Sequence, residues 1–153
     1  TQDEKDIQKY VAEFKEEFFS CEPEEIAFPR GVSNLEKWES SSEIYISATP
    51  IAVKGSLIYN HYIKKLKLEE KYEKIQQGDK IKFIYLKEEN PISGMKGDKV
   101  ISFPASIPKE LDIHRFVDYN MQFTKSFLDP LETILNVAGW KSKEEATLEG
   151  LFI

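Results

Sequence analysis

The chain has 153 residues and a formal net charge of −6, and 41% of its residues are apolar, 12% aromatic and 31% charged. This length predicts one domain with a core of its own, and so many aromatic residues exclude an intrinsically disordered chain. The single cysteine, Cys21, excludes an internal disulfide framework and a zinc site built from four thiolates.

The first predicted element is an amphipathic helix from Asp3 to Phe19. Apolar side chains recur there at three- and four-residue spacing, and acidic residues fill the first turn, where the helix dipole favours negative charge. Pro23 is predicted to end this helix. A short strand is then predicted over Glu25 to Phe28, and a serine-rich loop over residues 32–47 with a candidate strand at Ile44 to Ile46.

The middle of the chain predicts a second helix and a β-hairpin. The helix spans roughly Ile51 to Leu66, and Gly55 inside it indicates close packing of the backbone against a neighbour. A turn at residues 78–79 leads to a strand over Lys80 to Leu86, and Val100 to Phe103 is the strand that pairs with it.

The last helical region is predicted from about Ile113 to Phe127. It is expected to break at Asp129-Pro130, to resume as far as Val137, and to end at a glycine cap, Gly139. We therefore expect the α+β class, with amphipathic helices and a small antiparallel hairpin or sheet.

Charge is unevenly distributed along the sequence. The net charge is −7 over residues 1–47, +4 over residues 48–99 and −3 over residues 100–153. A basic middle could place one cationic surface on an acidic protein, as contact with a phosphate backbone requires. Solvated charges scattered over several faces would produce the same totals.

No complete active site is visible in the sequence. His61 and His114 lack the spacing of zinc ligands, and no serine stands in a G-x-S-x-G elbow. The segment around Gly94 and Gly97 lacks a phosphate-binding pattern, and no D-x-D pair follows a strand. We predict no catalytic residue, no metal site and no cofactor in this chain.

Two features do carry a functional hypothesis. The first is the basic middle, where lysines alternate with tyrosines and an asparagine, side chains that bind phosphates. Lys80 and Lys82 share one face of their predicted strand, although an ordinary half-buried strand has the same pattern. The second feature is the C-terminus, whose apolar Leu148, Leu151 and Phe152 could anchor a partner or fold back onto the domain.

Five segments of the sequence resemble a known family. They are EIAFPRGVSNLEKW (25–38), TPIAVKGSLIYNH (49–61), GDKIKFIYL (78–86), DKVISFP (98–104) and FVDYNMQFTKSFLDPLETIL (116–135). The same segments occur in this order in the C-terminal part of family B replicative DNA polymerases of T-even-type tailed bacteriophages.

The resemblance implies a polymerase thumb over residues 1–140, which grips primer-template duplex, and a sliding-clamp tail over residues 141–153. Leu148, Leu151 and Phe152 match the apolar anchors of that tail. Two residues, Ala48 and Asp129, differ from the family pattern, which the resemblance gives as a lysine at each of these positions. Together with the strand pattern, the resemblance implies these DNA-binding residues: Lys54, Tyr59, Asn60, Lys80, Lys82, Lys99, Tyr119 and Lys125.

The polymerase motifs S-L-Y-P-S and Y-x-D-T-D-S of the palm are absent. By the resemblance, Mg²⁺ would be held by that missing palm, so this chain is not expected to polymerise alone. Its expected partners are duplex DNA, the sliding clamp and the palm, fingers and exonuclease domains. Because Thr1 is not a starting methionine, we expect a trimmed or split piece of a phage-encoded protein.

That protein is expected in the cytoplasm of the bacterial host, since the sequence holds no apolar run near 18 residues and no signal peptide. The competing hypothesis is a stand-alone protein-interaction module that never contacts DNA.

Overall fold

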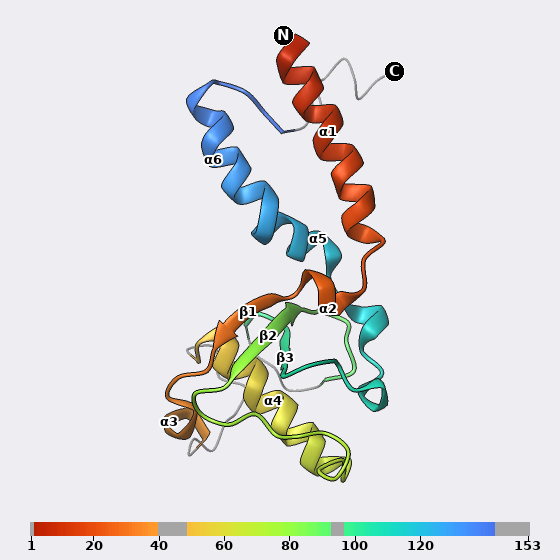
Figure 1. The fold of residues 1–153 in the computed structure, drawn as a ribbon, viewed down its shortest axis with the longest axis vertical. Coiled ribbons are helices and arrows are strands. Elements are labelled where there is room, and N and C mark those ends of the chain that lie inside the picture. The colour runs from red at the N-terminus through yellow and green to blue at the C-terminus, as the bar shows by residue number, and fades with distance from the viewer. Residues whose placement is uncertain (1, 40–48, 93–96, 143–153) are drawn as a thin grey trace. The chain divides into compact units, whose positions relative to one another are not determined.

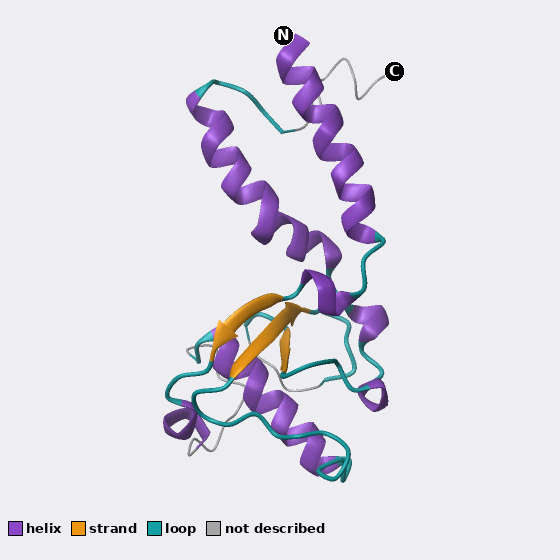
Figure 2. Cartoon of the chain, in the orientation of Figure 1, coloured by secondary structure: helices purple, strands orange, loops and turns teal. Residues whose placement is uncertain are grey.

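A computed structural model describes residues 2–39, 49–92 and 97–142. The chain divides into two compact units: unit 1 comprises the residues before Glu22 and after Asp118, and unit 2 comprises residues 22–118. The predicted α+β class is confirmed, since helices accompany a three-stranded antiparallel sheet (Figure 2). None of the described helices is long and apolar enough to cross a membrane.

Unit 1 is a helical hairpin. Its elements are α1 (Gln2–Phe19), α5 (Tyr119–Phe123), a π-helical turn (Thr124–Leu128) and α6 (Asp129–Val137) (Figure 1). The arms run antiparallel, because Tyr119 donates a hydrogen bond to the Cys21 carbonyl at one end and Gln8 to the Lys141 carbonyl at the other.

Aromatic rings form the core of unit 1. Phe14 of α1 lies 4.7 Å from Phe127, and Phe18 lies 5.2 Å from Phe123, measured between ring centroids. These are the tilted and edge-to-face distances at which aromatic pairs attract one another. The helix predicted at Asp3 to Phe19 is confirmed, with its apolar residues at the predicted spacing.

The predicted break at Asp129-Pro130 is wrong. Helical structure runs without interruption from Tyr119 to Val137. Pro130 lies in the first turn of α6, directly after the π-helical turn. Such a turn changes the hydrogen-bond ladder locally, so a proline can follow it without ending the helix. The predicted Gly139 cap is confirmed by its φ of 75° and by the Gly139 N–H bond to Asn136 O.

The predicted start of that last helix, near Ile113, is also wrong. Residues 116–118 pair with the end of strand β2 (Lys80–Tyr85) and the residues after it: Lys87 N–H donates to Phe116 O, and Asp118 N–H donates to Tyr85 O. Backbone groups used in this long-range pairing cannot also form a helix. In place of the predicted helical turns, residues 109–116 form two short 3₁₀ turns, Lys109–Leu111 and His114–Phe116.

Unit 2 is built on a sheet with strand order β1-β2-β3, both neighbouring pairs being antiparallel. Lys82 lies opposite Pro29 on one side and Phe103 on the other, so the predicted hairpin of β2 and β3 is confirmed. Its elements in chain order are α2 (Pro23–Ile26), β1 (Phe28–Gly31), α3 (Leu35–Glu39), α4 (Ile51–Lys65), β2 (Lys80–Tyr85) and β3 (Val100–Phe103).

The strand predicted at Glu25 to Phe28 is wrong in position. Pro23 opens the short helix α2 instead of merely ending α1, as proline does readily at a first helical position. The strand begins at Phe28 and contains Pro29, which an edge strand tolerates because its outward positions need no donor. Part of the predicted loop at 32–47 forms α3, and the candidate strand at Ile44 to Ile46 lies outside the described residues.

Helix α4 packs against β3, and Gly55 makes a close approach to that strand. A Cβ placed on Gly55 would lie 2.3 Å from Ser102 Oγ and 2.7 Å from Ser102 N. Only a glycine permits this separation, so the predicted close packing is confirmed. Ser102 Oγ also donates to the Ala52 carbonyl at 3.1 Å, which fixes the helix on the strand.

We predict that Gly55→Ala destabilises the protein by about 1–3 kcal/mol, since the added methyl must push α4 away from β3. Gly31→Ala is the matched control, because no atom lies within 4 Å of the Cβ it would add. Urea unfolding of the two variants tests this. Equal midpoints for Gly55→Ala and the parent chain would contradict the packing described above.

Candidate nucleic-acid interface

The predicted DNA-binding residues are divided between the two units. Tyr119 and Lys125 belong to unit 1, and the other six belong to unit 2. The predicted clamp-binding residues Leu148, Leu151 and Phe152 lie outside the described residues.

Strand β2 presents two of the predicted lysines to solvent. Lys80 and Lys82 are exposed, whereas Ile81 and Phe83 are buried on the other face. The predicted alternation is therefore confirmed at the start of this strand. Lys82 Nζ also donates to the Glu24 carbonyl at 3.4 Å, which holds the ammonium beside α2.

Arg30 adds a cation that the sequence analysis missed. It lies on β1 opposite Ile81, with its guanidinium carbon 5.9 Å from the Phe28 ring centroid and 5.6 Å from that of Phe83. Its Nη1 donates to the Pro29 carbonyl at 2.7 Å. The side chain is exposed yet held in place, which lowers the entropy lost when it binds an anion. In the sequence, the segment FPRG could have indicated this, because it places an arginine beside the phenylalanine and the proline that hold its side chain.

Lys99 and Lys125 are the remaining predicted lysines with solvent access. The Lys99 side chain is 18% exposed, and its Nζ lies 3.8 Å from Glu88 Oε2, a carboxylate that is itself largely exposed. Lys125 is exposed on the π-helical turn of unit 1. Both ammonium groups can reach solvent without a change of fold.

Tyr59 and Asn60 of α4 hold a neighbouring segment in place. Tyr59 is 1% exposed, and its hydroxyl donates to the Glu73 carbonyl at 3.1 Å. Asn60 bonds both backbone groups of Ile75, donating to the carbonyl at 2.9 Å and accepting from the N–H at 2.8 Å. These bonds fasten the chain between α4 and β2 onto the helix. Burial, with smaller effects from Tyr72 and Glu73, raises the pKa of Tyr59 to about 12.

Lys54 and Tyr119 are likewise bound inside their own units. Lys54 is 2% exposed, and its Nζ donates to the Asp98 carbonyl at 2.8 Å. The Tyr119 hydroxyl donates to Cys21 O at 2.7 Å, and its ring lies 5.6 Å from that of Phe19. Lys54, Tyr59, Asn60 and Tyr119 are thus the four of the eight predicted residues that bond backbone groups of their own unit from buried or half-buried positions.

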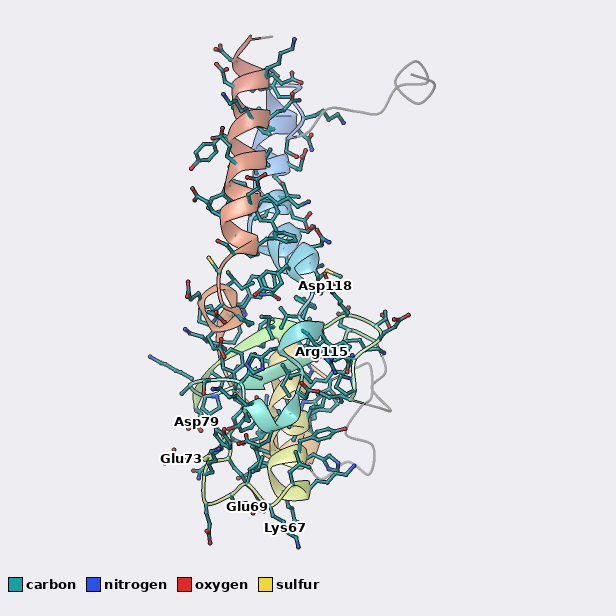
Figure 3. All side chains as sticks on the ribbon, turned by 90° about the vertical axis from the view of Figure 1, so that its right-hand side faces the viewer. Lys67, Glu69, Glu73, Asp79, Arg115 and Asp118 are labelled. Atoms are coloured by element: carbon teal, nitrogen blue, oxygen red, sulfur yellow. The ribbon has the colours of Figure 1, made fainter. Side chains whose placement is uncertain are left out.

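The far end of α4 carries further charges of both signs. Lys64 and Lys65 are exposed in its last turn, and Figure 3 shows Lys67 and Glu69 projecting at that end. Lys71 forms an ion pair with Glu110 at 2.5 Å. A hydrogen bond from Lys71 lowers the pKa of Glu110 to about 2, and the same bond raises the pKa of Lys71.

The two units differ in net charge. Unit 2 contains 15 Lys and Arg against 16 Asp and Glu, whereas unit 1 contains 6 against 11. The excess of acidic residues therefore lies in unit 1, and unit 2 can present local cationic surfaces without a large opposing field.

A pocket of about 460 Å³ opens on unit 2, and charged residues such as Glu24 and Lys71 are among those that line it. In it, Glu24 Oε1 accepts a hydrogen bond from Ile107 N–H at 3.3 Å and lies 3.6 Å from His114 Nε2. These contacts join α2 to the chain after β3. Within residues 2–39, 49–92 and 97–142, no group of three or more His, Cys, Asp or Glu could hold a metal ion.

No protein-family model matches the chain. The chain is similar to the DNA-directed DNA polymerase of Enterobacteria phage T4, with 28% identity over 153 residues. The match covers 97% of this chain and 16% of the T4 protein, so the chain spans about one sixth of that relative's length. This similarity supports a polymerase-related segment.

We predict that the stability contributed by Tyr59 falls as the pH rises from about 10 to 12. The unfolded chain releases the phenol proton near pH 10, whereas the folded chain keeps it until about pH 12, so ionisation favours unfolding by roughly 1 to 3 kcal/mol. Tyr59→Phe should be less stable than the parent at pH 8, and this difference should shrink by pH 11.5. Tyr10→Phe, at an exposed position, is the control in urea unfolding. A constant difference across this range would contradict the burial of the hydroxyl.

Proposed function

We propose that this chain is the thumb segment of a phage-type family B DNA polymerase and holds primer-template duplex by its phosphate backbone. Two observations support this: the similarity to T4 DNA polymerase along nearly the whole chain, and the exposed lysines at positions predicted to contact DNA. The exposed pair on β2 is the structural feature on which the proposal depends most, because a row of ammonium groups on a rigid strand suits phosphate contacts.

The direct phosphate ligands in this proposal are the predicted side chains that reach solvent. They are Lys80, Lys82, Lys99 and Lys125. Arg30 is not assigned to this set, because it shares a face of the sheet with Ile81 and Phe83, opposite to Lys80 and Lys82. The polar atoms of Tyr59, Asn60 and Tyr119 support the fold from within. Contacts of this kind hold duplex of any sequence, as a replicative enzyme needs.

Polymerisation itself would take place elsewhere in the longer protein. The palm motifs are absent from the sequence, so the carboxylates that hold Mg²⁺ for phosphoryl transfer would come from a palm domain. In this proposal the partners of the chain are duplex DNA and the palm, fingers and exonuclease domains. The site of action is the bacterial host's cytoplasm.

The C-terminal tail, residues 141–153, forms the second half of the proposal. The sequence ends in three apolar anchors, Leu148, Leu151 and Phe152, after a charged stretch, which is typical of a peptide that inserts into a pocket. We assign them to a sliding clamp, which would keep the polymerase on DNA while individual phosphate contacts break and reform.

One observation favours the competing hypothesis of a protein-interaction module. Ile134 and Val137 on α6 are 69% and 91% exposed, on a helix face that carries few charges. Such a face is typical of contact with another protein surface. It is also compatible with a thumb, whose neighbouring domains are protein. DNA binding distinguishes the two hypotheses.

We predict that the chain binds a labelled primer-template duplex with an affinity that falls steeply with salt. Replacing Lys80, Lys82 and Lys99 by Ala should reduce the slope of log K against log salt by about 2.7, since each phosphate contact contributes about 0.9. The control replaces Lys5, Lys9 and Lys15, exposed lysines of the acidic unit 1. Fluorescence anisotropy measures both. Equal slopes for the two triple variants would contradict the assigned ligands, and absent binding at low salt would favour the interaction module.

For the tail, Leu151→Ala with Phe152→Ala should weaken binding to a T-even-type sliding clamp at least tenfold, because buried apolar anchors dominate such contacts. The DNA salt slope should stay unchanged. Glu145→Gln with Glu149→Gln serves as the control within the same tail. Calorimetry with purified clamp gives the measurement, and unaltered clamp affinity in the double-alanine variant would refute this half of the proposal.

A further inference from the structure

Lys54 combines a charged end with almost complete burial. It lies on α4 next to Gly55, where the helix comes close to β3, and only 2% of the residue is exposed. Its Nζ donates a hydrogen bond of 2.8 Å to the carbonyl of Asp98, 44 positions later in the chain. The ammonium therefore fastens α4 to the backbone just before β3.

The residue after Asp98 is Lys99, one of the proposed phosphate ligands. The Lys99 carbonyl accepts the Leu86 N–H at 2.7 Å, so its backbone also joins the sheet. The backbone is therefore held on both sides of the Lys99 side chain: Lys54 binds the carbonyl before it, and Leu86 binds the carbonyl after it. The Lys99 side chain extends from that fixed base toward solvent and Glu88.

The electrostatics agree with this arrangement. Burial lowers the pKa of Lys54, and the charge of Lys99 lowers it further, while Asp98 raises it. The inner ammonium, that of Lys54, is held on a carbonyl oxygen. A phosphate that approached from solvent would meet Lys99, since Lys54 has too little exposed surface to reach it without leaving α4's packing.

We propose that Lys54 is a positioning residue for Lys99: its bond to the Asp98 carbonyl fixes the base of Lys99 so that the outer ammonium meets the DNA phosphate. This differs from the direct DNA contact that the family resemblance implies for Lys54. The role in DNA binding depends on the proposed function, whereas the positioning itself can be measured without DNA.

The first test uses hydrogen exchange on the free chain. Lys54→Met keeps the apolar stem and removes the donor, so exchange of the Leu86 amide, which is bonded to Lys99 O, should accelerate at least tenfold. The Ile75 amide, held by Asn60, is the internal control and should not change. Lys54→Arg should restore protection at Leu86. Unchanged exchange at Leu86, or equal acceleration at both amides, would overturn the positioning role.

The second test is a double-mutant cycle read through the salt slope. Lys99→Ala should reduce the slope of log K against log salt by about 0.9, and adding Lys54→Met should reduce it no further, because the residue it positions is gone. Lys80→Ala combined with Lys99→Ala is the control, and its two reductions should add. A total near 1.8 for Lys54→Met with Lys99→Ala would identify Lys54 as a phosphate ligand and overturn the proposal. If the parent chain binds no DNA, the proposed function fails and hydrogen exchange still decides the role of Lys54.

Discussion

Unit 2 depends on the close approach of α4 to β3 at Gly55. A helix normally packs with side chains between its axis and the strand, but here the Gly55 backbone lies almost against Ser102, with no room for a methyl group. Ser102 and Ser56 both donate to Ala52 O, so the polar groups at the contact are satisfied. This single constraint sets which residues of α4 are buried and which segments can be fastened to it.

The consequence is a division of labour among polar residues of one helix. Lys54, Tyr59 and Asn60 face protein, and each ends on a backbone group of a segment distant in sequence. A buried polar group left without a hydrogen-bond partner would lower the stability of the fold by about 1–3 kcal/mol. Lysines near the helix end and on β2 face solvent instead. The buried residues hold in place the backbone that carries the exposed lysines. In the proposed function this would lower the conformational entropy that is lost when a long side chain binds a phosphate.

Sequence patterns predicted α1, α4 and the hairpin because their signals are local: apolar spacing in the helices, and two short apolar runs separated by turn residues. They missed α2, because Pro23 was taken only as the end of the preceding helix, and they were wrong at Pro130, where a proline in the first turn allows the helix to continue. They also failed near Ile113, where pairing with residues 85–87 decides the backbone. The burial of Lys54 could not be predicted from the sequence either, because lysine is usually exposed and is buried here by the packing of α4 at Gly55.

The charge of unit 2 bears on how such a surface would hold DNA. Because its acidic and basic residues nearly balance, attraction to a phosphate backbone would come from a few exposed cations and not from the net charge of the unit. Few contacts make binding weak, because each phosphate contact adds only one increment to the affinity and to its salt dependence, and contacts to phosphates are the same at every step along a duplex. Such a surface suits a segment that must release DNA after each addition. Long residence would then require a separate attachment, which is the physical reason why the proposed function pairs a duplex-gripping thumb with a clamp-binding tail.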